Sequence, residues 1–197
     1  MNHLAHLFLS GENVEWIVGN FITDFLTPAE QRVMPPGIRQ GIQLHLFIDR
    51  TVDNHPLYKQ TISMIRSTQG KYAPVVADIF FDYLLYDHWD RYSCKPIGDF
   101  ITAIYSDIKN NLPPVIPVNV KERLIRMIDL DFLRSYSSVD YMEQTFSMLG
   151  KRVHFHHHLE DATRTFLHHE TELKQQFDQV FPDLVMACLD YRINLQN

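Results

Sequence analysis

Residues 41–56 read GIQLHLFIDRTVDNHP, and this stretch predicts a buried helix that carries ionisable side chains. His45 and Asp49 are four residues apart, slightly more than one helical turn, so both lie on one face, about 6 Å apart along the axis. Their neighbours, including Leu44 and Ile48, are apolar, which indicates that most of the helix is buried. Buried ionisable groups are costly unless they are paired or bind a cation. The pair is therefore either half of a metal site or an internal hydrogen-bonded couple.

Two further apolar stretches each contain an acid in a similar setting. Apolar residues recur at helical spacing in residues 13–26, where Asp24 follows Asn20 by four positions. Asp82 lies in residues 75–89, VVADIFFDYLLYDHW, the most apolar part of the chain. A cap or an arginine partner can satisfy each acid separately. If the acids of the three stretches meet, however, they repel one another unless a divalent cation holds them.

The composition is that of a globular protein with one domain. A chain of 197 residues with 45% hydrophobic residues can bury a sizeable core, and no segment shows the alternation of a strand. We therefore expect an all-α, single-domain helical bundle over residues 1–197. The net charge of −6 argues against a general nucleic-acid binder.

The cysteines and the N-terminal sequence bear on location. Cys94 and Cys188 have neither metal-ligand spacing nor the pattern of a disulfide framework, which fits a reducing compartment. The N-terminal stretch lacks the basic and apolar regions of a signal peptide, and no run approaches 18 apolar residues. We expect a cytoplasmic protein without a membrane partner.

Six histidines gather in the last third of the chain. They lie in a charged segment without a nearby pair of buried acids, which favours exposed surface side chains over specific metal ligands. The six are His154, His156, His157, His158, His168 and His169.

A site that combines the buried acids with His45 suits a divalent metal. Carboxylate and imidazole ligands together suit Mn²⁺, Fe²⁺ or Zn²⁺, and an excess of oxygen ligands favours Mn²⁺ or Mg²⁺. A metal with an open coordination position makes water nucleophilic and polarises a phosphoryl oxygen. The chemistry predicted from the spacing is the hydrolysis of a phosphoester.

Four segments resemble successive motifs of the acyl carrier protein phosphodiesterase family: MNHLAHLFLS at 1–10, GNFITDF at 19–25, PPGIRQGIQLHLFIDRTVDNHP at 35–56 and DIFFDYLLYDHW at 78–89. The resemblance implies an all-helical fold related to the HD-domain phosphohydrolases. It also implies hydrolysis of the phosphodiester that joins 4′-phosphopantetheine to a serine of holo-acyl carrier protein. The metal that it implies is Mn²⁺, with Mg²⁺ or Fe²⁺ as alternatives.

The resemblance also implies roles for individual residues. The metal ligands are then Asp24, His45, Asp49 and Asp82, with His45 and Asp49 also acting in catalysis. The residues expected to bind substrate or support the ligands are His3, His6, Asn20 and Asn54. His3, His6 and His88 are the candidates for protonating the leaving serine oxygen. Tyr83 stands where many relatives have histidine.

The implied partner is acyl carrier protein. Because that partner is acidic, we expect a basic docking patch formed by Lys121, Arg123, Arg126, Arg134, Lys151 and Arg152. Two alternatives remain open. One is a metal-dependent phosphohydrolase that acts on a nucleotide or another small phosphodiester. The other is a non-catalytic helical interaction protein, supported as a homodimer by its charged C-terminal helix.

Overall fold

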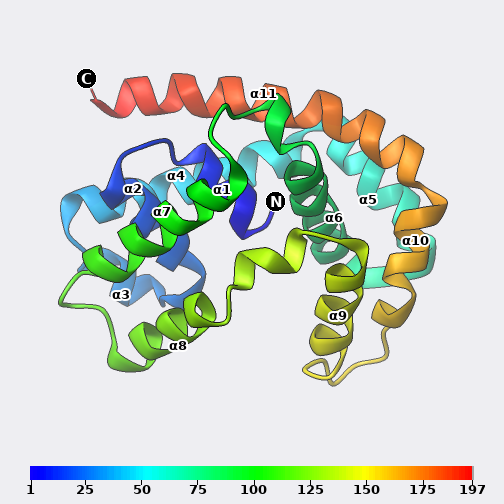
Figure 1. Cartoon of the computed structure of the whole chain (residues 1–197), viewed down its shortest axis with the longest axis horizontal. Coiled ribbons are helices and arrows are strands. Elements are labelled where there is room, and N and C mark those ends of the chain that lie inside the picture. The colour runs from blue at the N-terminus through cyan, green and yellow to red at the C-terminus, as the bar shows by residue number, and fades with distance from the viewer. Residues whose placement is uncertain (197) are drawn as a thin grey trace.

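The computed structural model describes residues 1–196, and every regular element in this range is a helix (Figure 1). No strand occurs in these residues, which confirms the all-α class; Asn197, the last residue of the expected domain, lies outside them. Short 3₁₀ helices lie between some of the α-helices, among them η1 (Thr23–Phe25), η4 (Phe132–Tyr136) and η5 (Leu159–Asp161). The α-helices are α1 (His3–Leu9), α2 (Val14–Ile22), α3 (Pro28–Arg32), α4 (Pro36–Asn54), α5 (Pro56–Gln69), α6 (Ala73–Asp87), α7 (Ile97–Asn111), α8 (Val118–Asp129), α9 (Val139–Gly150), α10 (Ala162–His168) and α11 (Glu170–Gln196).

Polar caps and prolines set where the site-bearing helices begin. The side chain of Asn13 accepts a hydrogen bond from the backbone nitrogen of Trp16 at 3.2 Å and caps the start of α2. Pro36 and Pro56 are the first residues of α4 and α5, where an N–H group would have no partner within the helix. Asn54, expected to cap the second of these helices, is instead the last residue of α4.

Helices α2 and α4 approach each other backbone to backbone. Gly19 on α2 and Gly41 on α4 lie at the crossing, and a Cβ atom added to either would collide with main-chain atoms of the other helix. A larger residue would therefore force the two helices apart. The close crossing places Asn20, the neighbour of Gly19, against His45, which lies one turn after Gly41.

The C-terminal helix α11 runs along one side of the molecule and contacts α4, α5 and α6 (Figure 1). Leu173, Phe177 and Phe181 on this helix are completely buried. Pro182 lies inside the continuous α11. The prolyl ring thus does not end the helix, because the apolar residues on both sides of it pack on the same core.

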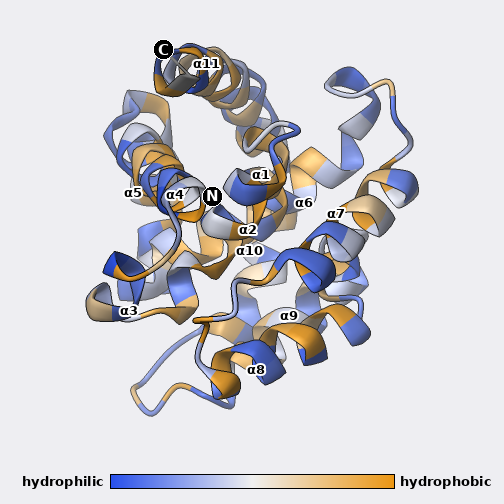
Figure 2. Ribbon diagram, turned by 90° about the vertical axis from the view of Figure 1, so that its left-hand side faces the viewer, coloured by the Kyte–Doolittle hydropathy of each residue, from blue (hydrophilic) through white to orange (hydrophobic). Residues whose placement is uncertain are grey.

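One hydrophobic core connects the helices. Figure 2 shows apolar residues mainly on the inner sides of the helices and hydrophilic residues mainly on the outer sides. None of the helices in residues 1–196 combines the length and the hydropathy that a membrane-spanning segment needs.

Candidate functional site

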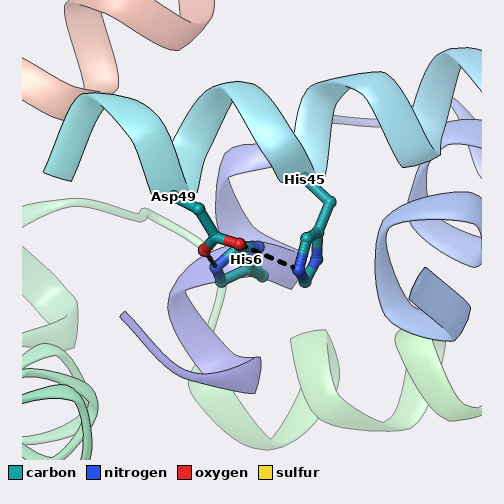
Figure 3. Close-up of side chains that lie close together, drawn as sticks. All are labelled: His6, His45 and Asp49. Atoms are coloured by element: carbon teal, nitrogen blue, oxygen red, sulfur yellow. Dashed lines mark ion pairs between the residues drawn. The ribbon is translucent and has the colours of Figure 1, made fainter. Parts of the chain in front are cut away.

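Two histidines and two aspartates converge where α1, η1 and α4 meet. Figure 3 shows three of them, His6, His45 and Asp49. The Nε2 atom of His45 lies 3.2 Å from Oδ2 of Asp49 and 3.3 Å from Oδ1 of Asp24. The Nε2 atom of His6 lies 3.2 Å from the other oxygen of Asp49. The histidine side chains are 5–6% exposed, whereas those of Asp49 and Asp24 are 43% and 54% exposed. The imidazoles thus form the floor of the site and the carboxylates reach its opening.

Asn20 fixes the orientation of both imidazole rings from behind. Its Oδ1 atom lies 2.9 Å from Nδ1 of His6 and 2.9 Å from Nδ1 of His45. Its Nδ2 group donates to the main-chain oxygen of His6 at 3.0 Å and to the hydroxyl of Ser10 at 2.8 Å, which fixes the orientation of the amide. An amide oxygen can only accept, so Nδ1 of each ring carries the hydrogen. In the neutral rings, both Nε2 atoms then present lone pairs to the site.

The acids and histidines change one another's protonation. Burial disfavours the charged form of His45, but the hydrogen bonds and charges of Asp24 and Asp49 outweigh it and raise its pKa to about 9. Burial lowers the pKa of His6, and Asp49 only partly offsets this effect. Burial raises the pKa of Asp49, but its hydrogen bonds with His45 and His6 reverse the balance and leave the pKa below its ordinary value. Without a cation, the proton on His45 balances part of the negative charge of Asp24 and Asp49.

The donor set fits a divalent transition metal. Donor atoms of His6, His45 and Asp49 lie within 4.8 Å of one another, and Asp24 adds a carboxylate beside His45. Neutral imidazoles held in one tautomer by a buried amide are characteristic of metal ligands. Two imidazoles with two carboxylates suit Mn²⁺, Fe²⁺ or Zn²⁺. The alternative of an internal hydrogen-bonded couple describes the same residues when no cation is bound.

The cluster opens into a cavity of about 390 Å³ whose lining is acidic. Besides Asp24 and Asp49, the lining includes Asp53 and Asp78, which the sequence analysis did not single out. Asp53 follows Asp49 by one more helical turn, so the spacing that indicated Asp49 could have indicated it as well. Asp78 accepts a hydrogen bond from the Tyr58 hydroxyl and lies 2.5 Å from the α-ammonium group of Met1.

Asp82, expected to be a metal ligand, lies outside the cluster. Its Oδ1 atom accepts a hydrogen bond from the backbone nitrogen of Asn2 at 3.0 Å, and its Oδ2 atom accepts one from Leu4 at 2.7 Å. The side chain is completely buried, and burial raises its pKa to about 7 although the N-terminal ammonium group and these two amides oppose that shift. Asp82 therefore anchors the start of α1, the helix that carries His6, and it does not line the cavity, so its role as a ligand stays a prediction.

Two other candidates also lie apart from the cluster. His88 is 3.5 Å from Asp87 and 3.5 Å from Asp178 on α11, and it does not line the cavity. Asn54 is exposed and donates to the main-chain oxygen of Arg50. Helical spacing could not reveal that His88 and Asn54 lie apart from the cluster. Both residues follow site candidates closely in sequence, but their side chains contact other neighbours.

His3 and Tyr83 have aromatic surroundings. The ring of His3 lies between Phe21, Phe25 and Phe132, with centroid distances of 5.5–6.0 Å, and burial lowers its pKa to about 4. Because Phe25 follows Asp24 in η1, His3 lies beside the element that carries Asp24. Tyr83 packs on Phe166, 5.1 Å between centroids, and does not line the cavity. The position at which this chain has tyrosine and many relatives have histidine therefore lies outside the cluster.

The chain was compared with known families and proteins. A family model described as "Acyl carrier protein phosphodiesterase" matches residues 1–184. Proteins of this name from Enterobacter sp. (strain 638) and Shigella boydii serotype 18 are each 27% identical, and the alignments cover 95% and 94% of this chain and 97% and 96% of the relatives. One from Escherichia coli O139:H28 is 29% identical over 68% of this chain and 75% of its own length. No solved structure matches the chain.

Proposed function

The chain belongs to the acyl carrier protein phosphodiesterase family, and from this membership we propose that it hydrolyses the phosphodiester joining 4′-phosphopantetheine to a serine of holo-acyl carrier protein. The products are then apo-acyl carrier protein and 4′-phosphopantetheine. The observation that carries the proposal is the pair of imidazoles that Asn20 orients toward two carboxylates at the floor of one cavity.

The acidity of the cavity supports a metal-dependent reaction. Asp24, Asp49, Asp53 and Asp78 all line the cavity, and a phosphodiester is itself an anion. Like charges at such short range disfavour binding unless a cation intervenes. We assign His6, His45, Asp24 and Asp49 as the residues that would hold it. We assign Mn²⁺ as the metal, with Mg²⁺ or Fe²⁺ as alternatives, because oxygen and imidazole ligands are combined.

Each residue of the cluster has a distinct task in this proposal. When bound, the metal supplies Lewis acidity toward a phosphoryl oxygen and toward water. Asn20 keeps Nδ1 of both rings protonated, so Nε2 of His6 and of His45 face the substrate side. We assign His6 to the metal-binding set rather than to proton donation, because its Nε2 atom contacts Asp49 in the same way as that of His45.

Other features of the proposal concern the partner and the architecture. Of the six cations expected to dock acyl carrier protein, Arg123 borders the site, with its guanidinium 4.8 Å from the ring centroid of Phe25. Arg134 is paired with Asp131 at 3.0 Å, which makes it less available. We further propose one domain of HD-like architecture, located in the cytoplasm.

The test is a reaction of the purified protein with holo-acyl carrier protein and Mn²⁺, followed by intact-protein mass spectrometry. We expect loss of the phosphopantetheine mass, blocked by a chelator and by Asp49→Ala. Arg50→Ala is the matched control, because it changes the neighbouring exposed residue on the same helix. Retained turnover in Asp49→Ala would remove the cluster from the mechanism. Stoichiometric metal binding without loss of mass would favour a small phosphodiester as substrate, and absence of both would favour an interaction protein.

A further inference from the structure

A second group of potential metal ligands lies at the junction of η5 and α10. Donor atoms of His158, Glu160 and Asp161 are within 4.8 Å of one another. These residues follow the segment 151–158, which joins α9 to η5 without regular structure. None of the three lines the acidic cavity at α1 and α4, and Figure 1 places α10 at the opposite end of the molecule from α2. The group is therefore separate from the candidate active site.

The same place is hollowed into a cavity of about 410 Å³. His158 and Asp161 line it together with two further histidines, His168 and His169, whose ring centroids are 4.6 Å apart. The sequence predicted exposed surface histidines here, because the segment is charged and has no nearby pair of buried acids. The fold brings both acids and histidines from the two ends of α10 to one cavity.

The ligands are free enough to bind a cation. Glu160 is 3.2 Å from His157, and Asp161 is 3.1 Å from Arg164. The carboxylates are 64% and 40% exposed, and ion pairs at exposed positions contribute little, so a divalent cation can replace them. His158 is exposed, and its closest aromatic contact is the edge of His156, with centroids 4.7 Å apart.

We propose that His158, Glu160 and Asp161 form a second metal site that takes a transition-metal dication, with Zn²⁺ as the ion that fits it. One imidazole and two carboxylates are a ligand set that Zn²⁺ accepts, and three protein ligands leave a fourth position open to water or to a histidine across the cavity. The bound ion links the end of segment 151–158 to η5, which leads directly into α10. Its consequence is a more rigid connection between α9 and α10.

The first measurement counts Zn²⁺ ions bound by the full chain, in competition with a chromophoric chelator. His158→Ala is expected to lose one equivalent relative to the wild type. His154→Ala is the matched control, because His154 is an exposed histidine of the same segment that is not part of the ligand group, and it should lose none. An unchanged count in His158→Ala overturns the proposal. An equal loss in both variants also overturns it, because binding would then be diffuse over the exposed histidines.

The second measurement tests the link between the metal and the segment. Lys151 and Arg152 are exposed at its start and are trypsin sites. Zn²⁺ is expected to slow cleavage there in the wild type and in His154→Ala, but not in His158→Ala or Asp161→Asn. Neither readout depends on hydrolase activity or on ions bound at His45. Equal protection in all four proteins would overturn the link.

Discussion

Replacing Asp82 by asparagine separates an anchoring role from a ligand role. Each carboxylate oxygen accepts one buried backbone N–H, from Asn2 and from Leu4. Asparagine has a single acceptor oxygen, so Asp82→Asn keeps one of these bonds and turns its own N–H₂ group toward the other amide. A buried donor left without a partner costs about 1–3 kcal/mol. At about 2–4 °C per kcal/mol for a chain of this size, we expect the melting temperature to fall by roughly 4–8 °C for a cost of about 2 kcal/mol.

The assay is calorimetric unfolding of the metal-free protein, accompanied by Mn²⁺ titration at a temperature where the variant is folded. Asp87→Asn is the matched control, because it removes an exposed acid from the same helix. We expect the control to shift stability by no more than about 0.5 kcal/mol. The Mn²⁺ stoichiometry of Asp82→Asn should equal that of the wild type, since Asp82 does not line the cavity.

The opposite pattern would refute the anchoring role. Suppose that Asp82→Asn has the melting temperature of the wild type but binds no Mn²⁺. Asp82 is then a ligand, and its hydrogen bonds to α1 contribute nothing measurable to stability. If both properties change, a titration of Asp87→Asn and of Asp49→Ala shows whether the loss of metal follows from unfolding or from the missing carboxylate.

Four further outcomes follow from the same contacts. Asn20→Ala removes the acceptor that orients both imidazoles, and we expect Mn²⁺ affinity to fall about 10–100-fold in titration calorimetry; an unchanged affinity would contradict the orienting role. Gly41→Ala inserts a methyl group between α2 and α4, and denaturant unfolding should show that the free energy of unfolding falls by about 1–3 kcal/mol. Gly98→Ala is the control, because the added atom meets open space there and should not cause this overpacking cost. Asn54→Ala should leave turnover of holo-acyl carrier protein unchanged, because Asn54 faces solvent away from the cavity; a loss of turnover would return it to the site. Because the folded protein raises the pKa of His45 to about 9, this residue stabilises the metal-free protein fully below its unfolded value near 6.5, and melting temperatures should fall as the pH rises from there toward 9; His45→Gln should lack this contribution.

The sequence alone determined the all-helical class and two residues of the site, His45 and Asp49. Helical spacing depends only on neighbours along the chain, so His45 and Asp49 could be placed on one face of a helix without any tertiary information. The apolar surroundings of the aspartates likewise indicated that each needs a partner. Family motifs then implied roles for His6 and Asn20, which the structure brings to the same place as Asp24 and His45.

Tertiary structure alone decided which partner each acid has and whether it is buried. Asp24 and Asp82 both have apolar neighbours in sequence, yet Asp24 is half exposed and meets His45 of α4, whereas Asp82 is buried and meets the backbone amides of Asn2 and Leu4. A periodic pattern reports that a side chain is buried but not which segment covers it. Partners in a folded chain are set by the crossing of helices distant in sequence, and that crossing depends on packing that no local pattern contains.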